Sequence, residues 1–177
     1  MFVRTQENID HYLEIVRKAA DDARAWIAKQ TGDPLVMLRQ MKCEAVGYHP
    51  IDGRPLNLVE QINQTWTYLV ALAAARQLLK LHPDAGGFRL APGAYTSEPL
   101  DIMSGVDGLV GAETFAAVDL HNNNKLARDL AKMAARSEQY RYVFHVSKIS
   151  RSEAPDRAGE RRDPGVVGRC LIPPFLN

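Results

Sequence analysis

The chain has 177 residues, of which 46% are hydrophobic and 24% are charged, a composition typical of one globular domain and unlike that of disordered or fibrous chains. The longest unbroken apolar run, Tyr68 to Ala75, is far too short to cross a bilayer, and the N-terminus has no apolar core of signal-peptide length, so neither secretion nor membrane insertion is expected. The formal net charge of +1 excludes the simplest kind of nucleic-acid-binding protein, a strongly basic chain.

The charge is unevenly distributed along the chain. Residues 1–119 contain 11 Lys and Arg against 15 Asp and Glu, a net charge of −4, whereas residues 120–177 contain 11 against 6, a net charge of +5. Cys43 and Cys170 lie far apart and have no CxxC neighbour, which is typical of unpaired cysteines in a reducing compartment. We therefore expect a cytoplasmic protein of one domain, residues 1–177.

The first third of the chain predicts one long helix and a connector. Apolar residues recur at helical spacing over residues 8–29, with Thr5 or Asn8 available as a cap, and Gly32, Asp33 and Pro34 end the pattern. Residues 33–55 are dense in turn formers and are interpreted as a connector, in which residues 35–41 could form either a short helix or a strand.

A second long helix is predicted over residues 57–82. Asn57 is the expected cap, and Glu60 stands three residues later, where a capping box places an acidic partner. The second half of this helix is rich in alanine, which favours close packing against a sheet.

After residue 87 the period changes from helical to alternating, which predicts strands. Asn122 to Asn124 then form a capping signal for another helix. The expected elements are strands at 88–90, 100–103 and 109–118, a helix at 125–135 and a strand at 140–146. Residues 150–165 read as a charged surface loop, followed by a short apolar segment at 166–175. The fold class is therefore α/β, with the order αβββαβ over residues 57–146.

Two acidic residues fall on neighbouring strands of this predicted sheet. Asp101 lies in the second strand, and Glu113 lies in the third among small residues, so that its carboxylate should be partly enclosed. An enclosed carboxylate is costly unless a positive or hydrogen-bonding group meets it. Two carboxylates with water in the remaining positions suit Mg²⁺, and such an ion supports phosphodiester hydrolysis.

The element order, Asp101 after Pro99 and Leu100, and Glu113 followed by Thr114 and Phe115 resemble the restriction-endonuclease-like nuclease superfamily, named for its PD…(D/E)xK motif. The resemblance covers residues 57–146 and implies that Asp101 and Glu113 hold Mg²⁺ or Mn²⁺. It implies Glu60 as a further metal ligand. Phe115 stands where the family places a lysine, and members of the family can supply that lysine from the following helix, which makes Lys125 the catalytic candidate.

The helix after Asn124 has a basic stripe that favours a phosphate backbone as partner. Its cations recur at spacings of three and four residues and are Lys125, Arg128, Lys132 and Arg136. Asp129 lies within the stripe at the spacing of an ion pair with Lys125. The resemblance therefore implies a divalent-metal-dependent nuclease that acts on DNA rather than RNA, as a possible homodimer or as part of a larger complex.

Other interpretations remain open on the sequence alone. Asp101 could cap the turn at residues 104–108, and Glu113 could pair with Arg89 at the surface. Because Phe115 replaces the motif lysine, the chain could be a catalytically inactive module that binds nucleic acid or protein in a defence or repair assembly. An enzyme for a small phosphorylated or carboxylated substrate is a third class, which would place Glu113 at the base of a closed apolar pocket. The five histidines form no zinc-binding pair.

Overall fold

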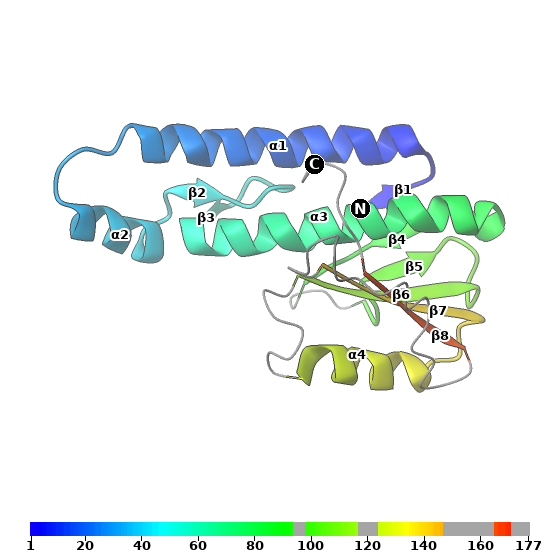
Figure 1. The fold of residues 1–177 in the computed structure, drawn as a ribbon. Coiled ribbons are helices and arrows are strands. Elements are labelled where there is room, and N and C mark those ends of the chain that lie inside the picture. Colours follow the sequence, from blue (N-terminus) through cyan, green and yellow to red (C-terminus); the bar gives the residue numbers. More distant parts are fainter. Residues whose placement is uncertain (94–97, 117–123, 147–164, 171–177) are drawn as a thin grey trace, which may run out of the picture.

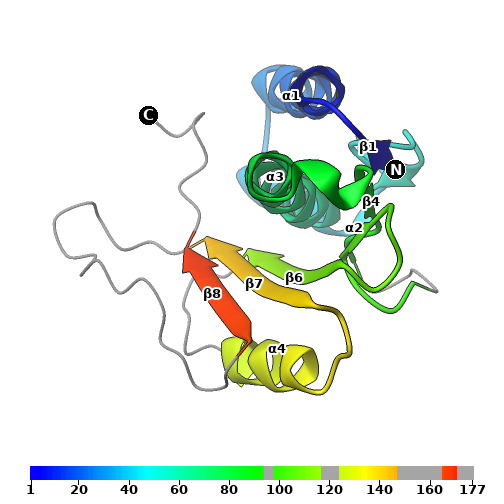
Figure 2. The same ribbon diagram turned by 90° about the vertical axis from the view of Figure 1, so that its right-hand side faces the viewer.

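The computed structural model describes residues 1–93, 98–116, 124–146 and 165–170. They form an α/β structure in which a mixed six-stranded sheet has the order β1-β4-β5-β6-β7-β8. The strands up to β6 pair antiparallel, whereas β6 pairs parallel with β7, and β7 pairs parallel with β8. The sheet lies between helices, with α3 and α1 on one face and α4 on the other (Figures 1 and 2).

The two long helices match their predicted positions. Helix α1 (Gln6–Ala28) begins at a capping box formed by Thr5 and Asn8, and α3 (Leu58–Leu81) begins at Asn57, whose Oδ1 accepts from the Glu60 N–H at 2.8 Å. Helix α3 lies directly on the sheet, and the alanine-rich half supplies Ala71, Ala74 and Ala75 as buried residues there, as the composition predicts. Helix α1 packs on the outside of α3.

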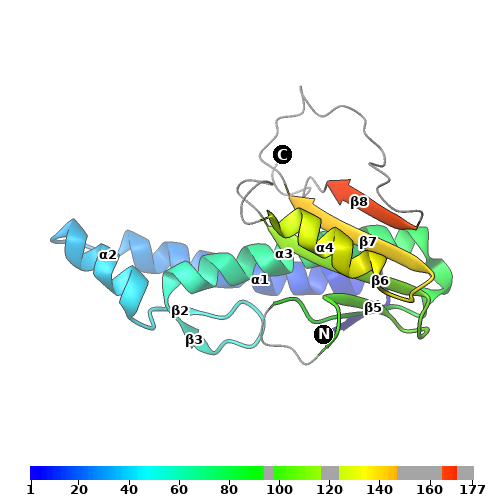
Figure 3. The same cartoon turned by 90° about the horizontal axis from the view of Figure 1, so that it is seen from below.

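The predicted connector contains structure of its own. Residues 35–41 belong to a helix, α2 (Pro34–Cys43), which is capped by Asp33 and has no fully buried residue. A small hairpin follows, in which β2 (Gly47–Tyr48) pairs with β3 (Pro55–Leu56). Together with the first half of α3 and the second half of α1, these elements extend beyond one end of the sheet (Figures 1 and 3).

The predicted order over residues 57–146 is observed, with shifted boundaries. After the short turn η1 (Pro83–Ala85), the elements are β4 (Phe88–Leu90), β5 (Ile102–Ser104), β6 (Val110–Ala116), α4 (Lys125–Ala134) and β7 (Tyr140–Val146). Asn124 precedes α4 in a left-handed conformation, and its side chain makes no capping hydrogen bond. The end of the predicted third strand, residues 117–118, and most of the loop at 150–165 lie outside the described residues.

Two edge strands were not predicted. β1 (Phe2–Val3) pairs with β4, and β8 (Val166–Cys170) pairs with β7 in the first part of the expected apolar end. None of the helices in the described part of the chain combines the length and the apolar composition that a bilayer crossing needs.

Alternate residues of β6 face two different cores. Val110 and Ala112 belong to a large core shared with α3, β4 and β7, whereas Phe115 belongs to a smaller one under α4. The members of the smaller core that are buried are Leu100, Phe115, Met133, Val143 and Val166. Glu113 lies on the same side of β6 as Phe115 because successive strand residues point to opposite faces.

Candidate functional site

Glu113 lies in β6 as predicted, whereas Asp101 lies one residue before β5 and not within the strand where the sequence placed it. Asp101 directly precedes Ile102, whose ladder partner is Ala112, and Glu113 directly follows Ala112. The negative charge of Asp101 acts on the Glu113 carboxyl strongly enough to shift its pKa. The two carboxylates that the sequence singles out are therefore brought together at one end of the sheet.

Glu113 is a buried carboxylate with one cationic partner. It is 5% exposed, and its Oε1 accepts a hydrogen bond from Lys132 Nζ at 2.7 Å. Burial raises the pKa of the Glu113 carboxyl, the Lys132 hydrogen bond opposes that shift, and the charges of Asp101 and Asp129 add to it. The surface interpretation, in which Glu113 pairs with Arg89, is wrong because Arg89 pairs with Glu98 instead.

Asp101 is anchored to the strand that carries Glu113. Its Oδ2 accepts from the Thr114 backbone N–H at 2.8 Å and from Thr114 Oγ1 at 2.9 Å. Burial raises the pKa of Asp101, while the two Thr114 hydrogen bonds and the charges of Lys125 and Lys132 lower it. The turn after β5 is held by Ser104 Oγ, which accepts from the Val110 N–H at 2.9 Å and donates to the Val106 carbonyl.

Lys125 lies at the same site but meets a different acid. Its Nζ donates to Asp129 Oδ1 at 2.6 Å, the pair that the helical spacing predicts, and lies 5.8 Å from the centre of the Phe115 ring. Asp129 is 4% exposed, and its Oδ2 is buried without a hydrogen-bond partner among the described residues. The site thus contains three carboxylates and two ammonium groups. We refer to Asp101, Glu113, Asp129, Lys125 and Lys132 as the charge cluster.

The basic stripe on α4 is largely neutralised by acids. Besides the two lysines of the charge cluster, Arg136 forms two hydrogen bonds with Glu138, at 2.6 and 3.1 Å, which lower the pKa of Glu138. Within the described residues, Arg128 is the one member of the stripe without an ion pair. Acids therefore pair with three of the four cations of the stripe, of which Arg136 lies two residues beyond the end of α4.

Phe115 fills the place of the motif lysine with an aromatic ring. The ring is 7% exposed and stacks on His145 of β7, with 5.6 Å between centroids. His145 Nδ1 is buried and has no hydrogen-bond partner among the described residues, and burial lowers the pKa of this imidazole. The strand position after Glu113 and Thr114 is thus part of the α4-side core.

Glu60 is not part of the charge cluster. It is exposed on α3, the helix on the other face of the sheet, and it lines a hollow of about 660 Å³ together with His49, Arg54 and Tyr68. His49 is 5% exposed, and its Nδ1 accepts from the Asp52 N–H at 3.2 Å. Burial lowers the pKa of His49.

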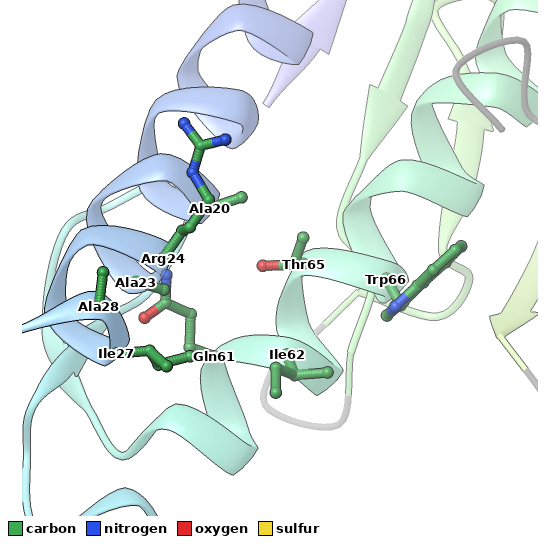
Figure 4. Close-up of a pocket in the computed structure, with 9 residues that line it drawn as sticks. All are labelled: Ala20, Ala23, Arg24, Ile27, Ala28, Gln61, Ile62, Thr65 and Trp66. Carbon is green, nitrogen blue, oxygen red and sulfur yellow. The ribbon is translucent and has the colours of Figure 1, made fainter. Parts of the chain in front are cut away.

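A second hollow, of about 420 Å³, lies between α1 and α3 and is almost wholly apolar (Figure 4). Its walls include Ala20, Ala23, Ile27, Ile62 and Trp66. Neither hollow is lined by Glu113. Neither therefore provides the closed pocket over Glu113 that the small-substrate interpretation requires.

The donor set of the charge cluster fits a hard divalent cation. Its carboxylate oxygens are the ligands that Mg²⁺ prefers, and the unpartnered Asp129 Oδ2 is a buried acceptor that a cation would satisfy. In the described ranges, however, no three His, Cys, Asp or Glu side chains already form a cage for an ion. Lys132 is in contact with Glu113 where a cation would compete for the same oxygen.

Comparisons with protein-family models, with curated proteins and with solved structures yield no match to this chain. The function must therefore be argued from the site itself.

Sequence reasoning placed two cluster residues in other roles. Lys132 was expected to contact phosphate, whereas in the structure it contacts Glu113. Asp129 was expected only as a surface partner of Lys125, yet it is buried. A usable signal existed, because Asp129 lies three residues after Leu126 and four before Met133, on the apolar side of the helix.

Proposed function

We propose that the protein is a divalent-metal-dependent nuclease with a restriction-endonuclease-like core, formed by α3, β4, β5, β6, α4 and β7. The observation that carries the proposal is the contact of Lys132 with buried Glu113, beside Asp101, which directly precedes β5 and is bonded to Thr114. An Asp, a Glu and a Lys at one sheet end are the three residue types that the PD…(D/E)xK motif brings together. Here the lysine comes from α4, because Phe115 occupies its usual strand position.

The charge cluster offers a role for each residue in phosphodiester hydrolysis. Asp101 and Glu113 would hold Mg²⁺ or Mn²⁺, and the bound cation would supply activation of the attacking water and stabilisation of the leaving oxygen. Lys132 has the stronger geometric claim to orient the water because it already contacts Glu113. Lys125, the residue favoured by sequence alone, lies close enough to lower the pKa of Asp101 and would stabilise charge on the phosphate.

In the proposed reaction, the oxygen of water forms a bond to phosphorus and the bond from phosphorus to the leaving sugar oxygen breaks. The proton lost by water passes to solvent, and the leaving oxygen takes up a proton. Arg128, exposed on α4, would contact the phosphate backbone outside the cluster, and the substrate is proposed to be DNA.

A catalytically inactive module of the same fold is the second candidate. It is favoured by the burial of Phe115 in the α4-side core and by the pairing of three stripe cations with acids. In that case the lysines would be permanent counter-ions of the buried carboxylates.

Supercoiled plasmid incubated with the full chain and Mg²⁺ or Mn²⁺ distinguishes the two candidates. We expect the wild type to nick or linearise plasmid, and Asp101→Asn and Glu113→Gln to lose that activity by at least about 100-fold. Glu98→Gln is the matched control, since Glu98 belongs to a partly exposed pair with Arg89. Binding without cleavage, weakened by salt, would support the inactive module. A wild type that neither binds nor cleaves plasmid would exclude the nuclease and the DNA-binding form of the inactive module, and would leave only a module that binds protein.

A further inference from the structure

Asp129 is an unusual residue for its position on α4. The helix exposes Arg128 and Lys132 on either side of it, yet Asp129 is 4% exposed. Aspartate is seldom fully buried unless a partner compensates its charge. Asp129 and Glu113 are the two buried acids of the charge cluster. Lys132, which contacts Glu113, follows Asp129 by three residues on α4, and the charge of Asp129 contributes to the raised pKa of Glu113.

The hydrogen bonds of Asp129 are incomplete. Oδ1 accepts from Lys125 at 2.6 Å, whereas Oδ2 is shielded from water and has no hydrogen-bond partner among the described residues. An ionised carboxylate oxygen without a partner is costly in a folded protein. A role limited to holding Lys125 accounts for Oδ1 but leaves Oδ2 unexplained.

The charge balance indicates what is missing. Three carboxyl groups share two ammonium groups in the charge cluster, so acidic groups outnumber basic ones by one. A cation that binds through carboxylate oxygens would satisfy both the excess acidic group and the unpartnered Oδ2. For it to reach Glu113 Oε1, Lys132 would have to withdraw, and Lys132 is free to do so because its side chain is 48% exposed.

We propose that Asp129 is the third carboxylate of the divalent-cation site and supplies Oδ2 from α4 as a ligand beside Asp101 and Glu113. This assignment rests on the proposed metal-dependent function of the same cluster. It differs from the family resemblance, which draws the helix carboxylate from α3 as Glu60. Glu60 is exposed on the face of the sheet opposite α4, whereas Asp129 is buried on α4, the helix whose Lys132 contacts Glu113.

Binding of Mn²⁺ to the full-length protein, measured by titration calorimetry and by the electron paramagnetic resonance signal of free Mn²⁺, tests the assignment without any nuclease assay. We expect Asp129→Asn to weaken Mn²⁺ binding by about 10-fold or more, comparable to Glu113→Gln. The control Glu98→Gln should bind Mn²⁺ as the wild type does. Thermal unfolding in EDTA verifies that each variant is folded, and Asp129→Asn should melt no lower than the wild type because it removes an unsatisfied charge.

Lys125→Met separates a ligand from a positioning residue. If Asp129 only holds Lys125, then Lys125→Met should weaken Mn²⁺ binding as much as Asp129→Asn does, and the proposal would be overturned. If Asp129 binds the cation, Lys125→Met should leave the affinity equal or higher, because it removes a competing charge. Glu60→Gln should have no effect on the affinity, and a 10-fold loss there, with Asp129→Asn unchanged, would transfer the role to Glu60.

Failure of this assignment and failure of the proposed function give different results. Wild-type affinity in Asp129→Asn, together with weakened binding in Glu113→Gln, would overturn the role of Asp129 alone. No Mn²⁺ binding by the wild type at millimolar concentration would overturn both.

Discussion

The two faces of the central sheet are made by the same strands but hold different kinds of residue. Under α3, the packed side chains are apolar, and Val70, Leu72 and Leu78 are fully buried. Under α4, a smaller apolar core adjoins Glu113 and Asp129, two carboxylates that are almost equally inaccessible. Alternation along β6 separates the two environments, since Ala112 faces one and Glu113 the other.

This difference teaches where stability and chemistry are concentrated. Burial of apolar surface stabilises the fold, whereas burial of ionised groups opposes folding unless partners compensate. The apolar burial on the α3 face can therefore offset the unfavourable free energy of burying charged groups on the α4 face. Substitutions on the first face should change the free energy of unfolding, and substitutions in the charge cluster should change cation binding and catalysis.

The largest expected effect is on the α4 face. Lys132→Met should lower the rate of plasmid cleavage by about 10²–10⁴-fold, because it removes the amine in contact with Glu113. The rate is measured under single-turnover conditions with Mg²⁺. Arg128→Met, an exposed cation on the same helix, is the control and should change the rate only a few-fold. Full activity in Lys132→Met together with none in Lys125→Met would assign the catalytic role to Lys125.

On the α3 face, the expected effect is on stability. Leu78→Ala should lower the free energy of unfolding by about 2–5 kcal/mol because it opens a cavity in the larger core. Urea unfolding followed by circular dichroism measures the change. Leu81→Ala, at a position 43% exposed on the same helix, should cost much less, under about 1 kcal/mol. Weakened Mn²⁺ binding by folded Leu78→Ala would show that the two faces are not separable.

On the α4 face, Asp101 should contribute to the pH dependence of stability. Because burial raises the pKa of Asp101, the folded state binds this proton more tightly than the unfolded state does. The free energy of unfolding of the wild type should therefore fall as pH rises from the pKa of Asp101 in the unfolded state to its higher pKa in the folded state. Above the folded-state pKa, the cost of burying the ionised carboxylate is present in full. Asp101→Asn keeps an acceptor for Thr114 and removes that cost, so in EDTA it should melt higher than the wild type at pH 7.

The difference in melting temperature between Asp101→Asn and the wild type should shrink as pH falls toward 3.8, the ordinary pKa of an aspartate side chain. Melting temperatures between pH 4 and 8 measure it, with exposed Asp107→Asn as the control. A gap that widens toward low pH would contradict the direction of the shift.

The smallest expected effect concerns an exposed ion pair between α1 and α3. Arg76 of α3 pairs with Asp10 of α1, and the Asp10 side chain is 61% exposed. Solvent screens such pairs, so Asp10→Asn should change the free energy of unfolding by less than about 1 kcal/mol, with no dependence on Mn²⁺. Urea unfolding with and without Mn²⁺ is the measurement. A larger loss would mean that ion pairs beyond the α4 face also matter for stability.

Much of the fold is predictable because its main elements carry local signals. The caps at Thr5 and Asn57 and the periodicity of α1 and α3 mark two helices to within a few residues, and the β-branched and aromatic run of β7 marks a strand. β1 and β8 are different. They exist through pairing with distant strands, such as Phe2 with Arg89, and short segments of this kind carry no decisive pattern of their own.

The candidate site was predictable only in part for a similar reason. The approach of Asp101 to the strand of Glu113 follows from the element order, although Asp101 lies one residue before β5. Which lysine meets Glu113 depends on how far α4 is shifted along the sheet, and Lys125 and Lys132 are two turns apart on that helix. A sequence shows which side of a helix a residue occupies but not the strand position beneath it.

The parallel pairing of β6 with β7 has a consequence for how this centre comes into being during synthesis. Parallel neighbours cannot be joined by a tight turn, so the chain returns along α4 before β7 can pair. Asp101 and Glu113 leave the ribosome first, and the residues that meet them follow on the return path. Any nascent fragment that stops before residue 125 lacks Lys125, Asp129 and Lys132, so the charge cluster can be completed only after the crossover has been synthesised.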